Sequence, residues 1–132
     1  MPESNQVTEH DVIRFIYERI DSVPNLEALL LIRSSKPQNW SADELAQRLY
    51  IDHNVALNLL QDLSRKNLIA KTAKAPERYF YAPASPEIDT LIEAVHAKYR
   101  AETVMVSNMI HRKASLAVRD FADAFRFTKE KE

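Results

Sequence analysis

The sequence predicts a mainly α-helical protein with one small β hairpin, and three observations lead to this fold class. Apolar residues recur at three- and four-residue spacing along most of the chain, as they do on the buried face of a helix. One stretch, residues 68–82, instead has the aromatic and apolar composition of two short strands. With 132 residues, the chain is long enough to bury one core and to carry a helical extension.

Two helices account for the first part of the sequence. Thr8 is an N-cap residue for the first helix, whose apolar positions continue to about Asp21. Pro24 fits the first turn of the second helix. This helix ends before Pro37, because the residue that precedes a proline avoids the α region.

Two further helices follow in close succession. Ser41 and Glu44 have the spacing of a capping box, in which the glutamate reaches back to the serine amide. Asp52 caps the next helix, and Asn67 follows its last turn, where a left-handed residue commonly ends a helix. The inward-facing residues of this fourth helix are Ala56, Leu59, Leu60 and Leu63.

A hairpin comes next, with strands at residues 68–72 and 78–82 and a loop at 73–77. The loop has no Asn-Gly or Asp-Gly pair, so we expect it to be longer than a two-residue turn. Trp40 is expected either to pair as a single strand residue or to close the edge of the core.

The C-terminal part is predicted to be one long helix and one short helix. Ser85 caps the long helix, which continues without a breaker to about Lys113 and is about 40 Å long. Ser115 caps the short helix, residues 115–126. The long helix has a continuous apolar stripe, formed by Ile88, Ile92, Val95, Tyr99, Thr103, Val106 and Ile110.

The order of these elements, together with several residues, resembles a known DNA-binding fold. The stretch from Ser41 to Asp52, continued by the leucines of the fourth helix and by residues 66–69, is similar to the winged helix-turn-helix of MarR- and PadR-like bacterial transcriptional regulators. The resemblance covers residues 25–83. No signature within it identifies one subfamily.

The resemblance implies two domains. A winged helix-turn-helix domain with the N-terminal helix would occupy residues 1–84, and residues 85–132 would form a long dimerisation helix plus a short C-terminal helix. Tyr50 stands where the family usually has glycine, and tyrosine tolerates a left-handed conformation poorly. We therefore expect the turn before Ile51 to be longer or differently shaped.

The resemblance also implies that helix 53–66 lies in the major groove of DNA. Its outward residues are the expected base contacts: His53, Asn54, Leu57, Asn58, Gln61 and Arg65. Residues 65–78 contain five basic residues and one acidic residue, so we expect the wing to contact phosphate. The expected phosphate contacts are Ser41, Lys66, Lys71, Lys74 and Arg78. The alternative is a solvated helix face beside a hairpin whose lysines protect an edge strand.

The apolar stripe of the long helix predicts a homodimer, because one small domain cannot cover so long a helix. The expected dimer-interface residues are Ile92, Val95, Tyr99, Val106, Met109, Ile110, Phe121 and Phe125. The alternative is that the last helix and the helix at residues 10–21 fold back and cover the stripe within one chain.

Composition excludes several classes of function. Without glycine the chain has no P-loop or dinucleotide-binding loop, and without cysteine it has no thiolate nucleophile and no cysteine-ligated zinc. The four histidines follow no metal-binding pattern, and there is no nucleophile elbow. We therefore expect no enzyme activity, no cofactor and no metal. The N-terminus does not resemble a secretion signal and no apolar run could cross a membrane, which favours a cytoplasmic protein.

The sequence thus favours a sequence-specific, double-stranded-DNA-binding transcriptional regulator that acts as a homodimer. The alternative is a winged-helix adaptor for protein–protein interaction that does not bind DNA, with its partner on the C-terminal helices. The net charge of −1 and the acidic residues in and beside the recognition helix favour the adaptor. A third interpretation is a small-molecule-binding domain without DNA affinity. The sequence identifies no small-molecule effector.

Overall fold

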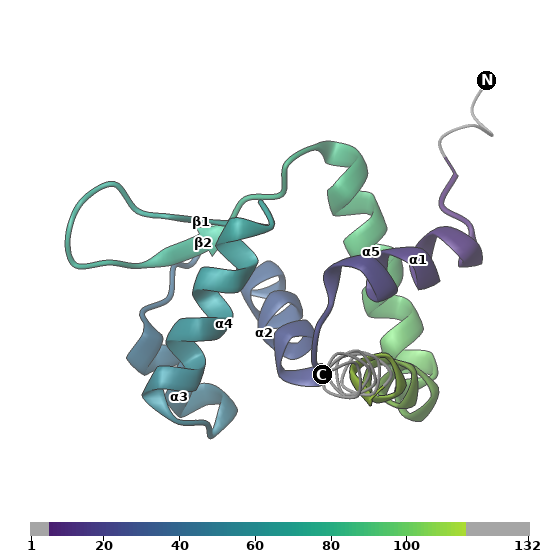
Figure 1. Ribbon diagram of the computed structural model, residues 1–132. Coiled ribbons are helices and arrows are strands. Elements are labelled where there is room, and N and C mark those ends of the chain that lie inside the picture. The colour runs from purple at the N-terminus through teal and green to yellow at the C-terminus, as the bar shows by residue number, and fades with distance from the viewer. Residues whose placement is uncertain (1–5, 116–132) are drawn as a thin grey trace, which may run out of the picture.

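The computed structural model describes residues 6–115. The elements are α1 (Glu9–Arg19), α2 (Val23–Ser34), α3 (Ala42–Leu49), α4 (His53–Arg65), β1 (Ile69–Lys71), β2 (Tyr79–Tyr81) and α5 (Pro86–Ala101). A further helical segment occupies residues 103–115. The two strands form one antiparallel hairpin that stands beside α4 (Figure 1). This is the mainly α fold with a small β wing that the sequence predicts.

Side chains just before the helices hold their first turns, which explains why the helix starts were predictable. The hydroxyl of Thr8 accepts a hydrogen bond from the Asp11 amide at 3.1 Å, and the Thr8 amide donates to the Asp11 carboxylate at 3.0 Å. Ser41 and Glu44 form the same capping box at the start of α3. Single caps precede the other helices, namely Ser22, Asp52 and Ser85.

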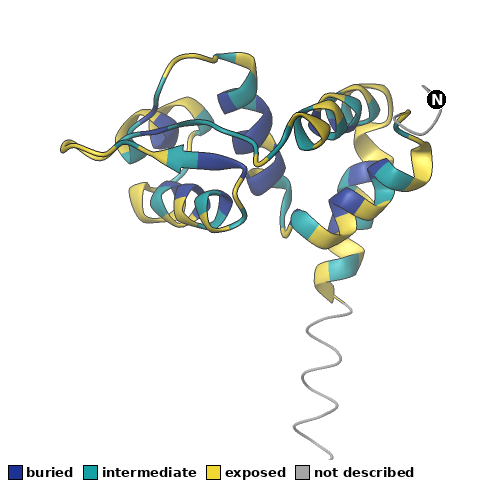
Figure 2. Ribbon diagram, turned by 90° about the horizontal axis from the view of Figure 1, so that it is seen from above, coloured by how far each residue is buried: buried dark blue, intermediate teal, exposed yellow. Residues whose placement is uncertain are grey.

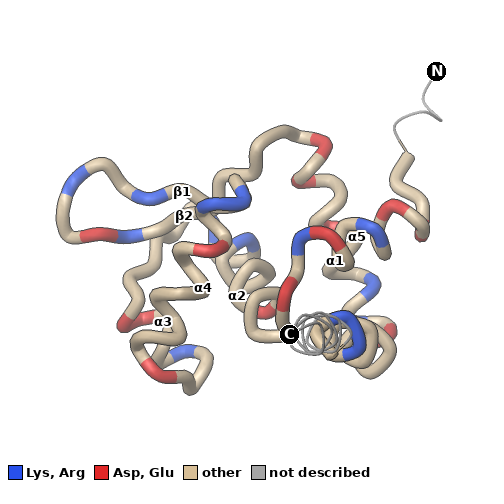
Figure 3. The backbone as a smooth tube through the Cα atoms, viewed as in Figure 1, with Lys and Arg blue, Asp and Glu red and all other residues tan. Residues whose placement is uncertain are grey.

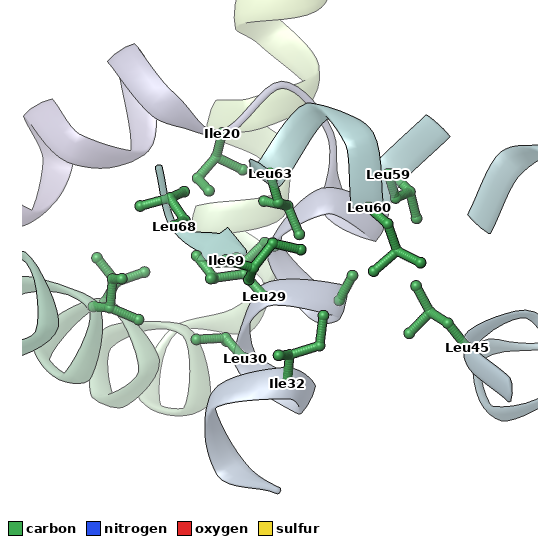
Figure 4. Packing of buried hydrophobic residues seen from close by; sticks show 14 of the residues in the cluster. Ile20, Leu29, Leu30, Ile32, Leu45, Leu59, Leu60, Leu63, Leu68 and Ile69 are labelled. Carbon is green, nitrogen blue, oxygen red and sulfur yellow. The ribbon is translucent and has the colours of Figure 1, made fainter. Parts of the chain in front are cut away.

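One apolar core joins the helices to the hairpin. Helix α2 packs against both α4 and β2 and brings Leu29 against the buried stripe of α4, in which Leu60 and Leu63 are fully buried (Figure 4). Helix α3 adds Leu45 and β1 adds Ile69. Burying a leucine or isoleucine side chain contributes about 1.5–3 kcal/mol. The position of α4 is therefore fixed by one face, while its opposite face points to solvent.

Within residues 6–115, two residues of this glycine-free chain adopt the left-handed conformation, both at helix ends. Asn67 has a φ of 62°, as predicted for the residue after the fourth helix. Tyr50 has a φ of 58° and a ψ of 47° and ends α3. The expectation of a longer or differently shaped turn before Ile51 is therefore wrong. Because the Tyr50 ring is 94% exposed, the conformation costs only local backbone strain, which the packing of the two helices outweighs.

The predicted single helix from residue 86 to 113 is also wrong. Helix α5 ends at Ala101, and Glu102, with a φ of −137° and a ψ of 54°, separates it from the segment 103–115. The change of direction brings Val106 and Ile110 into the core, where both are buried. A straight helix would have carried these two side chains away from the core.

The predicted boundary between the last two helices is displaced as well. The helical conformation continues through Ser115 instead of ending near Lys113. The rest of the predicted helix 115–126 lies outside the described residues.

Helix α1 packs against α5, on the side of the molecule away from the wing (Figures 1 and 2). The Lys98 ammonium on α5 donates to the Glu9 carboxylate on α1 at 2.8 Å. Lys113 Nζ donates to the carbonyl of Ile20, just after α1, at 2.8 Å. The division of the chain into two domains at residue 84 stays a prediction. The contacts of Lys98 and Lys113 join residues that lie on opposite sides of this boundary.

Candidate nucleic-acid interface

The candidate interface consists of α4 and the wing, which we define as β1, β2 and the loop of residues 72–78 between them. Helix α3 packs against α4 and holds it from one side. The wing leaves the body of the protein near the end of α4, and its loop extends into solvent (Figure 2). The arrangement places an exposed helix face and an exposed loop next to each other.

Most of the predicted base contacts share the solvent-facing side of α4. The exposed residues of this set are His53, Asn54, Asn58, Gln61 and Arg65. Leu57 is half-buried, so part of its side chain packs against the protein itself. Asparagine and glutamine amides can each donate and accept hydrogen bonds, which is the chemistry that base edges present in the major groove.

Two side chains on this face contact neighbouring carboxylates. His53 Nδ1 lies 2.6 Å from Asp43 Oδ1, which connects the first turn of α4 to the first turn of α3. The Arg65 guanidinium donates to Asp62 Oδ1 at 3.0 Å. The side chains of His53 and Arg65 are 52% and 71% exposed, respectively. Because the His53 and Arg65 side chains are largely exposed, both can exchange these partners for others.

Backbone hydrogen bonds fix the base of the wing. Strand β1 pairs with β2 with Ala70 opposite Phe80. Trp40 and Tyr79 exchange two backbone hydrogen bonds, of 2.7 and 2.8 Å, which confirms the predicted pairing of Trp40 as a single strand residue. The hydroxyl of Thr72 accepts a hydrogen bond from the amide at position 78, at 3.1 Å, and closes the loop.

Basic positions and one acidic position lie along the wing (Figure 3), and the basic side chains are less available to a ligand than their number suggests. Lys71 Nζ lies 3.3 Å from the Glu77 carboxylate. The same carboxylate accepts a hydrogen bond from the Tyr79 hydroxyl at 3.1 Å. Burial, reinforced by this carboxylate, raises the pKa of Tyr79. Lys74 lies at the exposed tip of the loop.

Arg78 points back toward the body of the protein. Its guanidinium donates to the side-chain oxygen of Asn39, to the Asn39 carbonyl at 3.2 Å, and to the carboxylate of Glu44 on α3. Its side chain is 29% exposed. The structure therefore places this predicted phosphate contact in an anchor between the wing and α3.

Lys66 is a structural tether between α4 and α1, and its contact with phosphate stays a prediction. Its ammonium donates to the Arg19 carbonyl at 2.8 Å and pairs with Asp21 at 2.9 Å and Asp62 at 3.0 Å. Two of the three donors of the ammonium make hydrogen bonds, to the Arg19 carbonyl and to Asp21, and Asp62 adds a second negative charge beside it. In return, the Arg19 guanidinium donates to the Lys66 carbonyl at 3.1 Å. Ser41, also predicted to contact phosphate, is half-buried at the start of α3.

Four of the predicted dimer-interface residues belong to the core of a single chain. Ile92, Val95, Val106 and Ile110 have exposed fractions of 0–1%. They are covered because α1 and the segment 103–115 fold against the rest of the protein, so they offer no surface to a second copy. For these four residues the alternative is correct: the chain itself covers the apolar stripe of the predicted long helix. Tyr99 and Met109 are half-buried, and Phe121 and Phe125 lie outside the described residues.

A polar cluster connects the wing with α2 and α5. Arg33 Nε donates to Asp89 Oδ1 at 3.0 Å, and the Tyr81 hydroxyl donates to the same oxygen at 2.5 Å. The hydrogen bond from Tyr81 and the neighbouring guanidinium hold the pKa of Asp89 below its ordinary value. Burial, together with the Asp89 carboxylate, raises the pKa of Tyr81. Strand β2 is thus joined to α5 through one shared carboxylate.

Sequence reasoning missed Asn39 and Glu44 as partners of the wing. The sequence marks Glu44 only as a capping residue, because its capping partner is three residues away, whereas Arg78 is 34 residues away. An acidic residue on α3 that faces a run of basic residues on the wing is the one signal from which the pairing could have been inferred.

Residues 6–115 contain neither a candidate metal site nor a candidate membrane span. No group of histidine, aspartate and glutamate side chains in this range could hold a metal ion. No helix in it has the length and the apolar composition needed to span a bilayer.

Three solved structures have a similar fold. A MarR family protein from Bacillus stearothermophilus is 14% identical, with a TM-score of 0.52 over 93% of this chain and 83% of its own. A MarR family transcription regulator is 22% identical, with a TM-score of 0.52 over 89% of this chain and 82% of its own. The adhesin competence repressor from Streptococcus pyogenes is 20% identical, with a TM-score of 0.50 over 93% and 91% of the two chains. No protein-family model and no curated protein matches the sequence.

Proposed function

We propose that this protein is a transcriptional regulator that binds double-stranded DNA through α4 and the wing. The observation that carries the proposal is the solvent-facing polar side of α4, which lies beside an exposed, lysine-bearing loop. Among residues 6–115, nothing covers the side chains of Asn54 and Asn58 or the loop tip. The chain shares its fold with a MarR family transcription regulator and with the adhesin competence repressor, which supports a similar role here.

In the proposed complex, α4 enters the major groove and the wing follows the adjacent backbone. The amides of Asn54, Asn58 and Gln61 pair with base edges, with adenine as the base that suits them best. Lys71 and Lys74 neutralise phosphates and release counterions, which provides affinity without sequence choice. Sequence preference therefore comes from α4, and most of the salt dependence comes from the wing.

Regulators of this geometry read a two-fold site when they act as homodimers, and we propose this assembly here. The segment 103–115 supports it, because Val104 is 72% exposed and Met105 is 39% exposed, next to the half-buried Met109. Met109 also packs against the core, whereas Val104 and Met105 present apolar surface to solvent. Sedimentation at micromolar concentration should show a dimer, and a strict monomer would reject this part of the proposal.

The affinity for random duplex DNA, measured at several salt concentrations, tests the proposal. Counterion release predicts a steep loss of affinity between about 50 and 200 mM salt. Lys74→Ala should lower the slope of log affinity against log salt by about 0.9, the effect of one lost phosphate contact. Arg100→Ala is the matched control, because it removes an exposed positive charge from α5, away from the wing, and should leave the slope unchanged.

Two results would count against DNA binding. The wild-type protein could fail to bind any duplex at about 50 mM salt, where non-specific binding is strongest. Alternatively, Lys74→Ala and Arg100→Ala could have the same slope. Either result favours the second candidate, a protein-interaction adaptor. That candidate is supported by the pairing of Lys71 with Glu77 and of Arg78 with Glu44, which reduces the positive charge that the wing presents.

A further inference from the structure

The wing has a single side-chain anchor on α3 among the described residues, and that anchor is made by Arg78. Its guanidinium reaches Asn39, which precedes α3, and Glu44, in the first turn of α3. Glu44 also accepts a hydrogen bond from the Ser41 amide at 3.1 Å, so one carboxylate caps α3 and holds the wing. The position of the wing is thereby tied to the start of the helix that supports α4.

A wing this small needs such a connection. Each strand has only three residues, and a two-stranded hairpin is marginally stable by itself in water. The backbone pair between Trp40 and Tyr79 holds the base of the wing, and Arg78 is the next residue toward the tip. Beyond Arg78 the loop residues 73–77 are exposed. The orientation of the loop therefore depends on how firmly Arg78 is held.

The chemistry of the contact suits arginine and not lysine. Guanidinium nitrogens Nε and Nη2 donate to three acceptors, two on Asn39 and one on Glu44. A planar fork can satisfy acceptors in several fixed directions, whereas the ammonium of lysine is a point charge on a flexible stem. These contacts use three of the five N–H donors of the guanidinium, including the donors that face α3, so the side chain is held in place and only its Nη1 donors are left for a phosphate.

We infer that Arg78 and Glu44 are positioning residues for DNA binding: together they hold the wing at the angle to α4 that a duplex requires. The inference rests on the proposed function and assigns the phosphate contacts to Lys71 and Lys74. If Arg78 and Glu44 hold the wing in this way, Glu44 strengthens DNA binding although its negative charge repels phosphate.

The effect of Glu44 on DNA affinity can be measured with a variant that removes only its charge. Glu44→Gln removes one negative charge and keeps the capping box, because glutamine also serves at this position of a capping box. If charge alone mattered, the variant would bind duplex DNA more tightly than the wild type. If Glu44 positions the wing, affinity should fall roughly tenfold, the scale of one lost charge-assisted hydrogen bond. Asp52→Asn is the charge-matched control, because asparagine also caps α4 well, and it should bind slightly more tightly.

A second variant separates positioning from phosphate contact. Arg78→Lys keeps the charge and loses the fork, so it should lose about as much affinity as Glu44→Gln. The double variant should be no weaker than either single variant, since both break the same contact. Melting curves should show that every variant is fully folded at the temperature of the binding assay, so that the loss of affinity is not one of folding.

The inference is overturned if wild-type protein binds duplex DNA and Glu44→Gln binds as tightly or more tightly, or if Arg78→Lys binds like the wild type. An absence of binding by the wild-type protein is a separate result that refutes the proposed function itself.

Discussion

Replacing Tyr50 by glycine should stabilise the protein, although tyrosine is the larger and more hydrophobic residue. The left-handed backbone at this position costs a residue with a Cβ atom about 1–2 kcal/mol. Glycine removes that cost, but its freedom in the unfolded chain offsets about 0.4–1 kcal/mol. The ring itself is 94% exposed, so its removal loses almost no buried apolar surface. The expected net gain is about 0.5–1 kcal/mol.

Thermal and urea unfolding followed by circular dichroism measure this gain. For a chain of this length the melting temperature should rise by about 2–4 °C. Tyr50→Ala is the control that separates backbone from side chain: it removes the ring but keeps the Cβ atom, so it should stay within about 0.5 kcal/mol of the wild type. If Tyr50→Gly is no more stable than Tyr50→Ala, the left-handed backbone at position 50 does not lower the stability of the wild type, and the reasoning fails.

Two further predictions concern the polar contacts that hold α4 and the wing. The pKa of Asp89 is lowered in the folded protein, so its stabilising effect is complete above the ordinary aspartate pKa of about 4 and is lost as the pH falls through the folded value. Asp89→Asn should therefore be less stable at neutral pH, and urea midpoints should show its difference from the wild type shrinking below about pH 4; a constant difference would contradict this. Lys66→Met should destabilise the protein by about 1–3 kcal/mol, because the Arg19 carbonyl loses a hydrogen bond and Asp21 and Asp62 both lose a positively charged partner. Its DNA-binding salt slope should stay at the wild-type value, and a drop like that of Lys74→Ala would restore Lys66 as a phosphate contact.

Local signals explain which parts of the fold were predictable. A cap acts over three residues, so Thr8, Ser41 and Ser85 could be identified without knowing the fold. Asn67 was predictable for the same reason, since its left-handed conformation depends on its own side chain. Tyr50 was not, because there the packing of two helices decides the conformation against the preference of the residue.

The break at Glu102 had no sequence signal of its own. No proline or glycine lies near it, and the apolar stripe continues in register through it. What breaks the helix is the gain from burying Val106 and Ile110 in the core, which is a property of the whole fold. The same limit applies to the predicted dimer face. Periodicity shows that one side of a helix is buried, but not whether the same chain or a second copy covers it.

Charge at the candidate interface is the clearest case in which counting along the sequence misleads. Five basic residues between positions 65 and 78 suggest a strongly positive wing. In the folded chain Lys66 points into a tether with α1, Lys71 faces Glu77, and Arg78 is held by Glu44. A duplex would therefore meet a weaker positive field than the sequence indicates. To gain more electrostatic attraction, its phosphates must displace the carboxylates of exposed pairs, such as Glu77 from Lys71. Salt screens the attraction between these lysines and the phosphates. The affinity for DNA should therefore depend more on the shape of α4 and the angle of the wing than on the number of cations at the interface.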